Sequence, residues 1–145
     1  MELKKEKQEK ARTLLVRLNC SLVVISREGA VRTFYNRGVR DLYTLLRRDP
    51  EFMDGAVVAD KLTGAGAAVL MSAGNIDSLF TFVVSEPALE RLRNAGIEVE
   101  YENVVSNIIN RAGTDICPVE KLVAGVPDIK ECVDKIGTFL SGLKQ

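Results

Sequence analysis

The sequence contains no histidine, and it has only three cysteines among its 145 residues. Without histidine, the chain has no Ser-His-Asp or Cys-His catalytic arrangement and no zinc site with an imidazole ligand. The cysteines Cys20, Cys117 and Cys132 are odd in number and form no Cys-x-x-Cys pair. We therefore expect reduced thiols and no bound metal.

Long apolar runs and an excess of one charge are also absent. No stretch approaches the roughly 20 apolar residues that cross a bilayer, and the charged first residues lack the core of a signal peptide. We expect a cytoplasmic protein without a membrane partner. Lys and Arg total 20, as do Asp and Glu, which argues against a nucleic-acid partner. The group Arg37, Arg40, Arg47 and Arg48 could meet a phosphate, but it more simply forms the solvated face of a helix.

The chain is long enough and apolar enough, with 46% hydrophobic residues, for one domain over 1–145 with its own core. Apolar patterns predict helices over 2–18 and 128–143 and further helices between the strands. This order predicts a three-layer α/β domain, in which a mixed sheet carries helices on both faces. The five predicted strands lie near 20–26, 30–35, 56–60, 77–84 and 97–101, and the first two should form an antiparallel hairpin.

The stretch from Asp60 to Gly66 joins a buried apolar strand to a helix of small residues. In α/β proteins ligands bind at such places, because free N–H groups and the positive helix end face them. Here Lys61 and the glycines Gly64 and Gly66 lie between strand and helix. Neither Walker spacing nor a Gly-x-Gly-x-x-Gly pattern is present, so a simple tight turn is the alternative.

Cys117 directly precedes a proline at a predicted helix start. The helix end favours the thiolate, so this residue can serve as a nucleophile, a redox sensor or only a cap. With no histidine as a base, Lys61 or Arg111 would have to stabilise the thiolate. Cys20 and Cys132 are expected in the core as small apolar side chains.

Several short motifs follow one another along the chain: Asp60-Lys61, Gly64, Ala67-Ala68, then Asn110-Arg111, then Cys117-Pro118-x-Glu120. This ordered set resembles the small bacterial family called domain of unknown function 1893, over about 21–123. That family is similar in fold to cytidine deaminases, which implies a deaminase-like core near 20–124 between the two terminal helices.

Catalytic deaminases carry His-x-Glu at one helix start and Pro-Cys-x-x-Cys at the second. In this sequence the stretch 61–65 has neither His nor Glu, and Glu120 stands where the partner cysteine would be. The resemblance therefore implies the deaminase architecture and pocket without zinc and without deamination.

We expect this pocket to bind a nucleotide-like ligand, for example of ADP-ribose type. Lys61 and Arg111 would contact its phosphate, and Asn110 would read a base edge or a ribose hydroxyl. The alternatives are a metal-free enzyme, with Cys117 or Lys61 as the covalent residue and Asp60 in acid–base chemistry, and a pocket holding only water. No cofactor is expected, and a homodimer is left open. The expected ligand-binding set is Asp60, Lys61, Gly64, Asn110, Arg111, Cys117 and Glu120.

Overall fold

A five-stranded sheet organises the computed structural model, which describes residues 3–143. The strand order is β2-β1-β3-β4-β5. β1 pairs antiparallel with both β2 and β3, whereas β3, β4 and β5 are parallel. The predicted mixed sheet and its hairpin are thereby confirmed. The strands are β1 (Leu22–Ile25), β2 (Val31–Phe34), β3 (Val57–Thr63), β4 (Ser78–Ser85) and β5 (Glu98–Val105).

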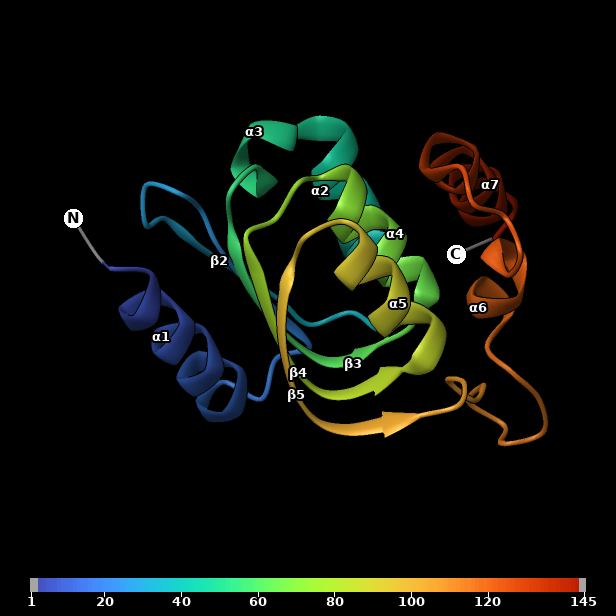
Figure 1. Ribbon diagram of the computed structural model, residues 1–145, viewed down its shortest axis with the longest axis horizontal. Coiled ribbons are helices and arrows are strands. Elements are labelled where there is room, and N and C mark those ends of the chain that lie inside the picture. Colours follow the sequence, from blue (N-terminus) through green and yellow to red (C-terminus); the bar gives the residue numbers. More distant parts are fainter. Residues whose placement is uncertain (1–2, 144–145) are drawn as a thin grey trace.

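Helices cover both faces of the sheet (Figure 1). α1 packs over β1, β3 and β4 on one face, and α4 and α5 pack on the other. The sheet with helices on both faces is the predicted three-layer arrangement. α6 and α7 contact α4 and lie farther from the sheet. The helices are α1 (Lys4–Arg17), α2 (Arg40–Arg48), α3 (Pro50–Met53), α4 (Ala65–Ala73), α5 (Glu86–Asn94), α6 (Pro118–Val123) and α7 (Ile129–Gly142).

The core has two parts because the sheet is covered twice. In β1, Val23 and Ile25 belong to the smaller apolar cluster beneath α1, while Leu22 and Val24 belong to the larger cluster beneath α4. All four side chains are buried. A strand covered on both faces is apolar at consecutive positions, which is why this strand is recognisable in the sequence.

α4 is the central helix, and its first seven residues are all buried. Small side chains allow neighbouring elements to approach closely. At Gly66 an added Cβ would lie 2.2 Å from Cγ1 of Val119, the second residue of α6. Gly66 therefore serves the packing of α6 on α4.

Side-chain hydrogen bonds cap two of the helices, α5 and α7. The Ser85 hydroxyl accepts the N–H of Ala88 at 3.2 Å, and the Asp128 carboxylate accepts the N–H of Glu131 at 3.2 Å. Both caps depend only on residues three positions apart, so the sequence alone reveals them.

Some boundaries differ from the prediction. α1 begins at Lys4, and the predicted start at residue 2 lies outside the described residues. The short helix α3 was not predicted, and β5 continues to Val105 because its pairing with β4 continues to that residue. Within residues 3–143, no helix combines the length and apolar character needed to cross a membrane.

Candidate functional site

A cavity of about 670 Å³ lies at the carboxyl end of β3. Its walls come from the start of β1, the segment between β2 and α2, the end of β3, the start of α4, and the chain before and within α6. In open α/β sheets, ligands bind outside the carboxyl ends of strands. All seven residues of the expected ligand set line this one cavity: Asp60, Lys61, Gly64, Asn110, Arg111, Cys117 and Glu120.

The glycine loop expected between β3 and α4 is not a loop. β3 continues past Asp60 to Thr63, because Leu62 and Thr63 still pair with Val83 and Val84 of β4. Only Gly64 separates the strand from α4. Asp60 is therefore a strand residue that is 8% exposed, rather than part of an exposed turn.

Asp60 belongs to a chain of hydroxyl groups. The Thr63 hydroxyl lies 3.0 Å from Asp60 Oδ2 and 2.9 Å from the Thr81 hydroxyl, which donates to the Val83 carbonyl at 3.0 Å. When Asp60 is protonated, each of these contacts can hold one proton, with every hydroxyl donating to the next oxygen.

Burial raises the pKa of Asp60 from 3.8 to about 7, and hydrogen bonds from Thr63 and the backbone at Leu62 and Lys61 counteract it only in part. Asp60 is therefore a group inside the pocket that can gain or lose a proton near neutral pH. Such a group can donate to a ligand or exchange a proton with it.

Glu120 lies buried where three hydrogen-bond donors meet. Its Oε2 accepts the N–H of Ala65, the first residue of α4, at 2.6 Å, and the Ser85 hydroxyl at 2.7 Å. Its Oε1 accepts the N–H of Ile108. The carboxylate is 3% exposed. Glu120 thus joins α6, the starts of α4 and α5, and the loop after β5.

This contact changes the role expected for the start of α4. The positive helix end and its first N–H already bind a carboxylate of the chain, so they are not free for a ligand phosphate. Gly64 has no left-handed backbone, with φ of −97°. An added Cβ there would lie 3.1 Å from Ile108 and 3.3 Å from Glu120 Oε2, so the space serves this internal contact.

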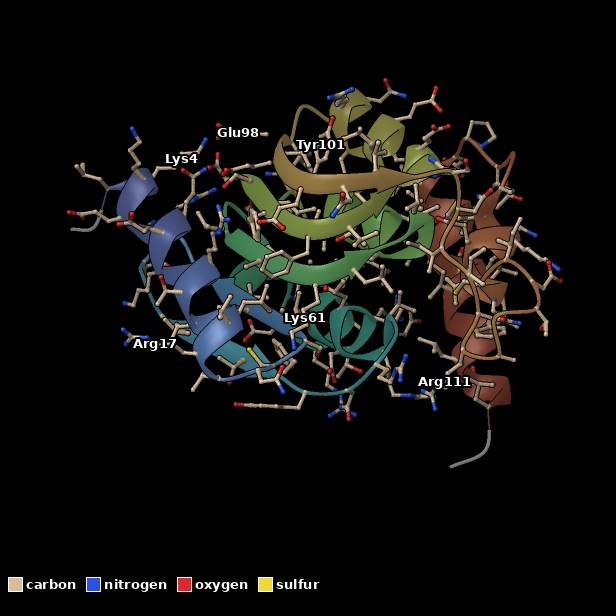
Figure 2. All side chains as sticks on the ribbon, turned by 90° about the horizontal axis from the view of Figure 1, so that it is seen from below. Lys4, Arg17, Lys61, Glu98, Tyr101 and Arg111 are labelled. Carbon is tan, nitrogen blue, oxygen red and sulfur yellow. The ribbon has the colours of Figure 1, made fainter. Side chains whose placement is uncertain are left out.

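Three cations line the cavity. Lys61, Arg37 and Arg111 form no ion pair with a carboxylate among residues 3–143. The Lys61 ammonium donates to the Asn19 side-chain oxygen. Lys61 belongs to the end of β3, on the side of the N-terminal helix in Figure 2, whereas Arg111 belongs to the loop between β5 and α6, so the two border the pocket from different elements.

Asn110 organises its own loop. Its side-chain oxygen accepts the N–H of Thr114 at 3.0 Å, and its amide donates to the Thr114 hydroxyl at 3.2 Å. These bonds hold the turn that presents Arg111. In the described structure, Asn110 therefore acts on the loop, with its side chain engaged there.

The three cysteines differ in exposure. Cys117 is half-buried in the pocket wall at the start of α6, whereas Cys20 and Cys132 are 1% and 0% exposed, as expected for core residues. Burial raises the pKa of Cys132. Among the residues that the structure describes, no three His, Cys, Asp or Glu side chains gather as metal ligands.

Sequence reasoning missed the contribution of the segment before α2. Arg37 was grouped with three later arginines on a helix face, but α2 begins only at Arg40, and Arg37 lines the pocket with Tyr35 and Asn36. Asn36 donates to Asp41 at 3.0 Å, which anchors this segment to α2. The signal was the polar, glycine-containing stretch 36–38 that follows the hairpin.

The fold and the pocket together define a class: a three-layer α/β domain with one large cavity at the end of its central strand. The family model described as "TM1506: Domain of unknown function (DUF1893)" matches residues 10–140. The chain belongs to this family. The match is broader than the resemblance seen in the sequence, since it includes most of both terminal helices.

A solved structure has the same fold. The crystal structure of a DUF1893 family protein, TM1506 from Thermotoga maritima, aligns with a TM-score of 0.84 over 95% of this chain and 92% of that one. The two sequences are 24% identical, so this likeness concerns the fold alone. No curated protein matches the chain.

Proposed function

We propose that the cavity binds a nucleotide-like small molecule, of which ADP-ribose is one type. The observation that carries this proposal is the set of three cations, Arg37, Lys61 and Arg111, that line one cavity of about 670 Å³ and have no acidic partner within residues 3–143. A pocket of this size accepts a ligand of nucleotide dimensions. Unpaired guanidinium groups bind phosphate oxygens through paired hydrogen bonds.

The buried carboxylate of Glu120 limits where such a ligand can lie. Since Glu120 fills the start of α4, the phosphate groups belong beside Arg37, Lys61 and Arg111, and the uncharged part of the ligand lies deeper. Tyr35 lines the cavity and can stack on a base. Asp60, protonated below about pH 7, can donate to a ring nitrogen or carbonyl oxygen.

We further propose that the scaffold is deaminase-like in architecture but not in chemistry. The pocket lies between the starts of α4 and α6, which are the two helix starts that the resemblance implies. At these starts the residues are Gly64, Cys117 and Glu120, and Glu120 makes a direct bond between them by accepting the Ala65 N–H. This side-chain set supports binding better than zinc-dependent deamination.

Thermal unfolding with a ligand panel tests the binding proposal. The panel holds ADP-ribose, ADP, AMP, adenosine and ribose 5-phosphate, and the variants are Arg37→Ala, Arg111→Ala and Lys61→Ala. A ligand at a hundred times its Kd stabilises the native state by about 2.7 kcal/mol, which gives a clear rise in Tm. We expect phosphate-bearing members to stabilise the wild type and Arg93→Ala, an exposed arginine of α5 outside the pocket.

Each cation variant should lose roughly tenfold or more in affinity, as expected for one hydrogen bond to a charged group. If no panel member raises the Tm of the wild type, or if all three variants respond like Arg93→Ala, the proposal is wrong.

The enzyme alternative rests on the half-buried thiol of Cys117 in the same cavity as Asp60. A covalent mechanism predicts an adduct on Cys117 or on Lys61. Mass spectrometry of the intact chain after incubation with the same panel tests it, with Cys117→Ser and Lys61→Ala as controls. If a ligand raises the Tm but leaves the mass of the chain unchanged, the covalent mechanism is wrong and binding remains the proposed function.

A further inference from the structure

A second hollow, of about 270 Å³, lies between α2 and α7. It shares no lining residue with the larger cavity. Three arginines and three hydroxyl-bearing residues line it, together with Gly137 and Leu140, and no carboxylate does so. The polar lining residues are Arg40, Arg47, Arg48, Tyr43, Thr44 and Ser141.

The arginines share one face of α2. Arg40, Thr44, Arg47 and Arg48 follow the spacing i, i+4, i+7 and i+8, which places side chains on the same side of a helix. The sequence analysis treated these arginines as a solvated helix face together with Arg37. The structure separates Arg37, which lines the larger cavity, from the other three.

These three positive charges are not compensated by a described carboxylate. Basic residues elsewhere, such as Arg12 and Arg32, have a carboxylate within 4 Å, but Arg40, Arg47 and Arg48 have none among residues 3–143. Since the chain has a formal net charge of zero, this is a local excess of positive charge. Such an excess beside a hollow attracts anions.

The hollow is partly organised before any ligand arrives. The Arg40 guanidinium donates to the Leu140 carbonyl at 3.3 Å, which holds it against α7. The Arg47 guanidinium lies 6.0 Å from the centre of the Tyr43 ring. An added Cβ at Gly137 would lie 2.3 Å from the Tyr43 hydroxyl, so the absence of a side chain there gives that hydroxyl its place.

We propose that this hollow binds a phosphate or pyrophosphate group, independently of any ligand in the larger cavity. Arg47 and Arg48 offer guanidinium forks that match phosphate oxygens, and the hydroxyls of Tyr43 and Thr44 supply further donors. The group is either an inorganic anion or the phosphate end of a small organic ester, since both present the same oxygens.

Calorimetric titration at low ionic strength tests the site. The probes are inorganic phosphate, inorganic pyrophosphate and glycerol 3-phosphate, and the variant is Arg47→Ala/Arg48→Ala. Both arginines are exposed, so the fold should survive, which circular dichroism verifies. The matched control is Arg93→Ala/Lys130→Ala, which removes the same charge from exposed positions outside both cavities. Arg111→Ala reports on the larger cavity.

We expect at least one probe to bind the wild type at this site with a stoichiometry of about one. The Arg47→Ala/Arg48→Ala variant should bind that probe tenfold or more weakly, which is roughly the value of one charge-assisted hydrogen bond. The control and Arg111→Ala should retain this binding. Tighter binding of inorganic pyrophosphate would identify an inorganic anion, and tighter binding of the ester an organic phosphate. The proposal is refuted if no probe binds, if the control loses as much affinity as the α2 variant, or if only Arg111→Ala weakens binding.

Discussion

Replacing Glu120 by alanine removes the acceptor that joins four elements of the structure. The N–H groups of Ala65 and Ile108 and the hydroxyl of Ser85 would then lose their bonds to it in a buried environment. Because the side chain is 3% exposed, water does not easily replace the carboxylate. The variant should therefore lose stability well beyond the loss of one exposed hydrogen bond.

The magnitude follows from the three bonds. Each buried donor left without a partner costs about 1–3 kcal/mol, and removal of one member of a buried charged network costs about 3–5 kcal/mol in total. Part of the loss is offset because a buried charge is also removed. We expect about 3–5 kcal/mol less free energy of unfolding for Glu120→Ala, and about 2 kcal/mol less for Glu120→Gln, which keeps one acceptor oxygen.

Urea unfolding followed by circular dichroism measures this change, provided the slope of the free energy against urea stays constant. Glu90→Ala is the matched control, because Glu90 is an exposed carboxylate on α5. That variant should stay within about 0.5 kcal/mol of the wild type. A double-mutant cycle between Glu120→Ala and Ser85→Ala isolates their shared bond, since Ser85 also caps α5.

A Glu120→Ala variant within about 1 kcal/mol of the wild type would refute the reasoning, because the donors would then have found other partners. Negligible coupling between Glu120 and Ser85 would refute the assignment of that one bond. The same experiment bears on the ligand proposal, since a cavity without Glu120 leaves the start of α4 open to an anion.

Three further predictions concern the pocket and its neighbours. The pKa of Asp60 is raised from 3.8 to about 7 in the native state, so the contribution of this group to stability should be full below about pH 4 and fall by up to about 4 kcal/mol as the pH rises to about 7. Asp60→Asn should lack this slope in urea unfolding between pH 4 and 8, and an unchanged slope would contradict the assignment. Gly66→Ala should lower the free energy of unfolding by about 1–3 kcal/mol in spite of alanine's better helix propensity, because the new methyl group would lie 2.2 Å from Val119. A gain in stability would show that α6 moves away without cost. Cys117 should be the one thiol modified by maleimide in the native protein, since the other two cysteines are at most 1% exposed; equal labelling of all three, read by peptide mass spectrometry, would contradict the burial.

Local patterns determined most of the secondary structure. The hairpin, the five strands and the caps at Ser85 and Asp128 are visible in the sequence because each depends on neighbours a few residues apart or on simple alternation. The absence of histidine likewise excludes several site chemistries without any structure. The motifs around Asp60 and Cys117 belong to segments that line one cavity.

Tertiary contacts decided what those segments do. β3 extends beyond Asp60 because β4 supplies hydrogen-bond partners for its last residues, and no local pattern encodes that pairing. Glu120, which is 55 positions away in the chain, accepts a hydrogen bond from the N–H of Ala65. Arg37 lines the same pocket as the end of β3, although the two are far apart in the sequence. The sequence thus determined most of the elements that form. Whether Glu120 or a ligand phosphate binds at the start of α4 depended on side chains that meet only when the chain is folded.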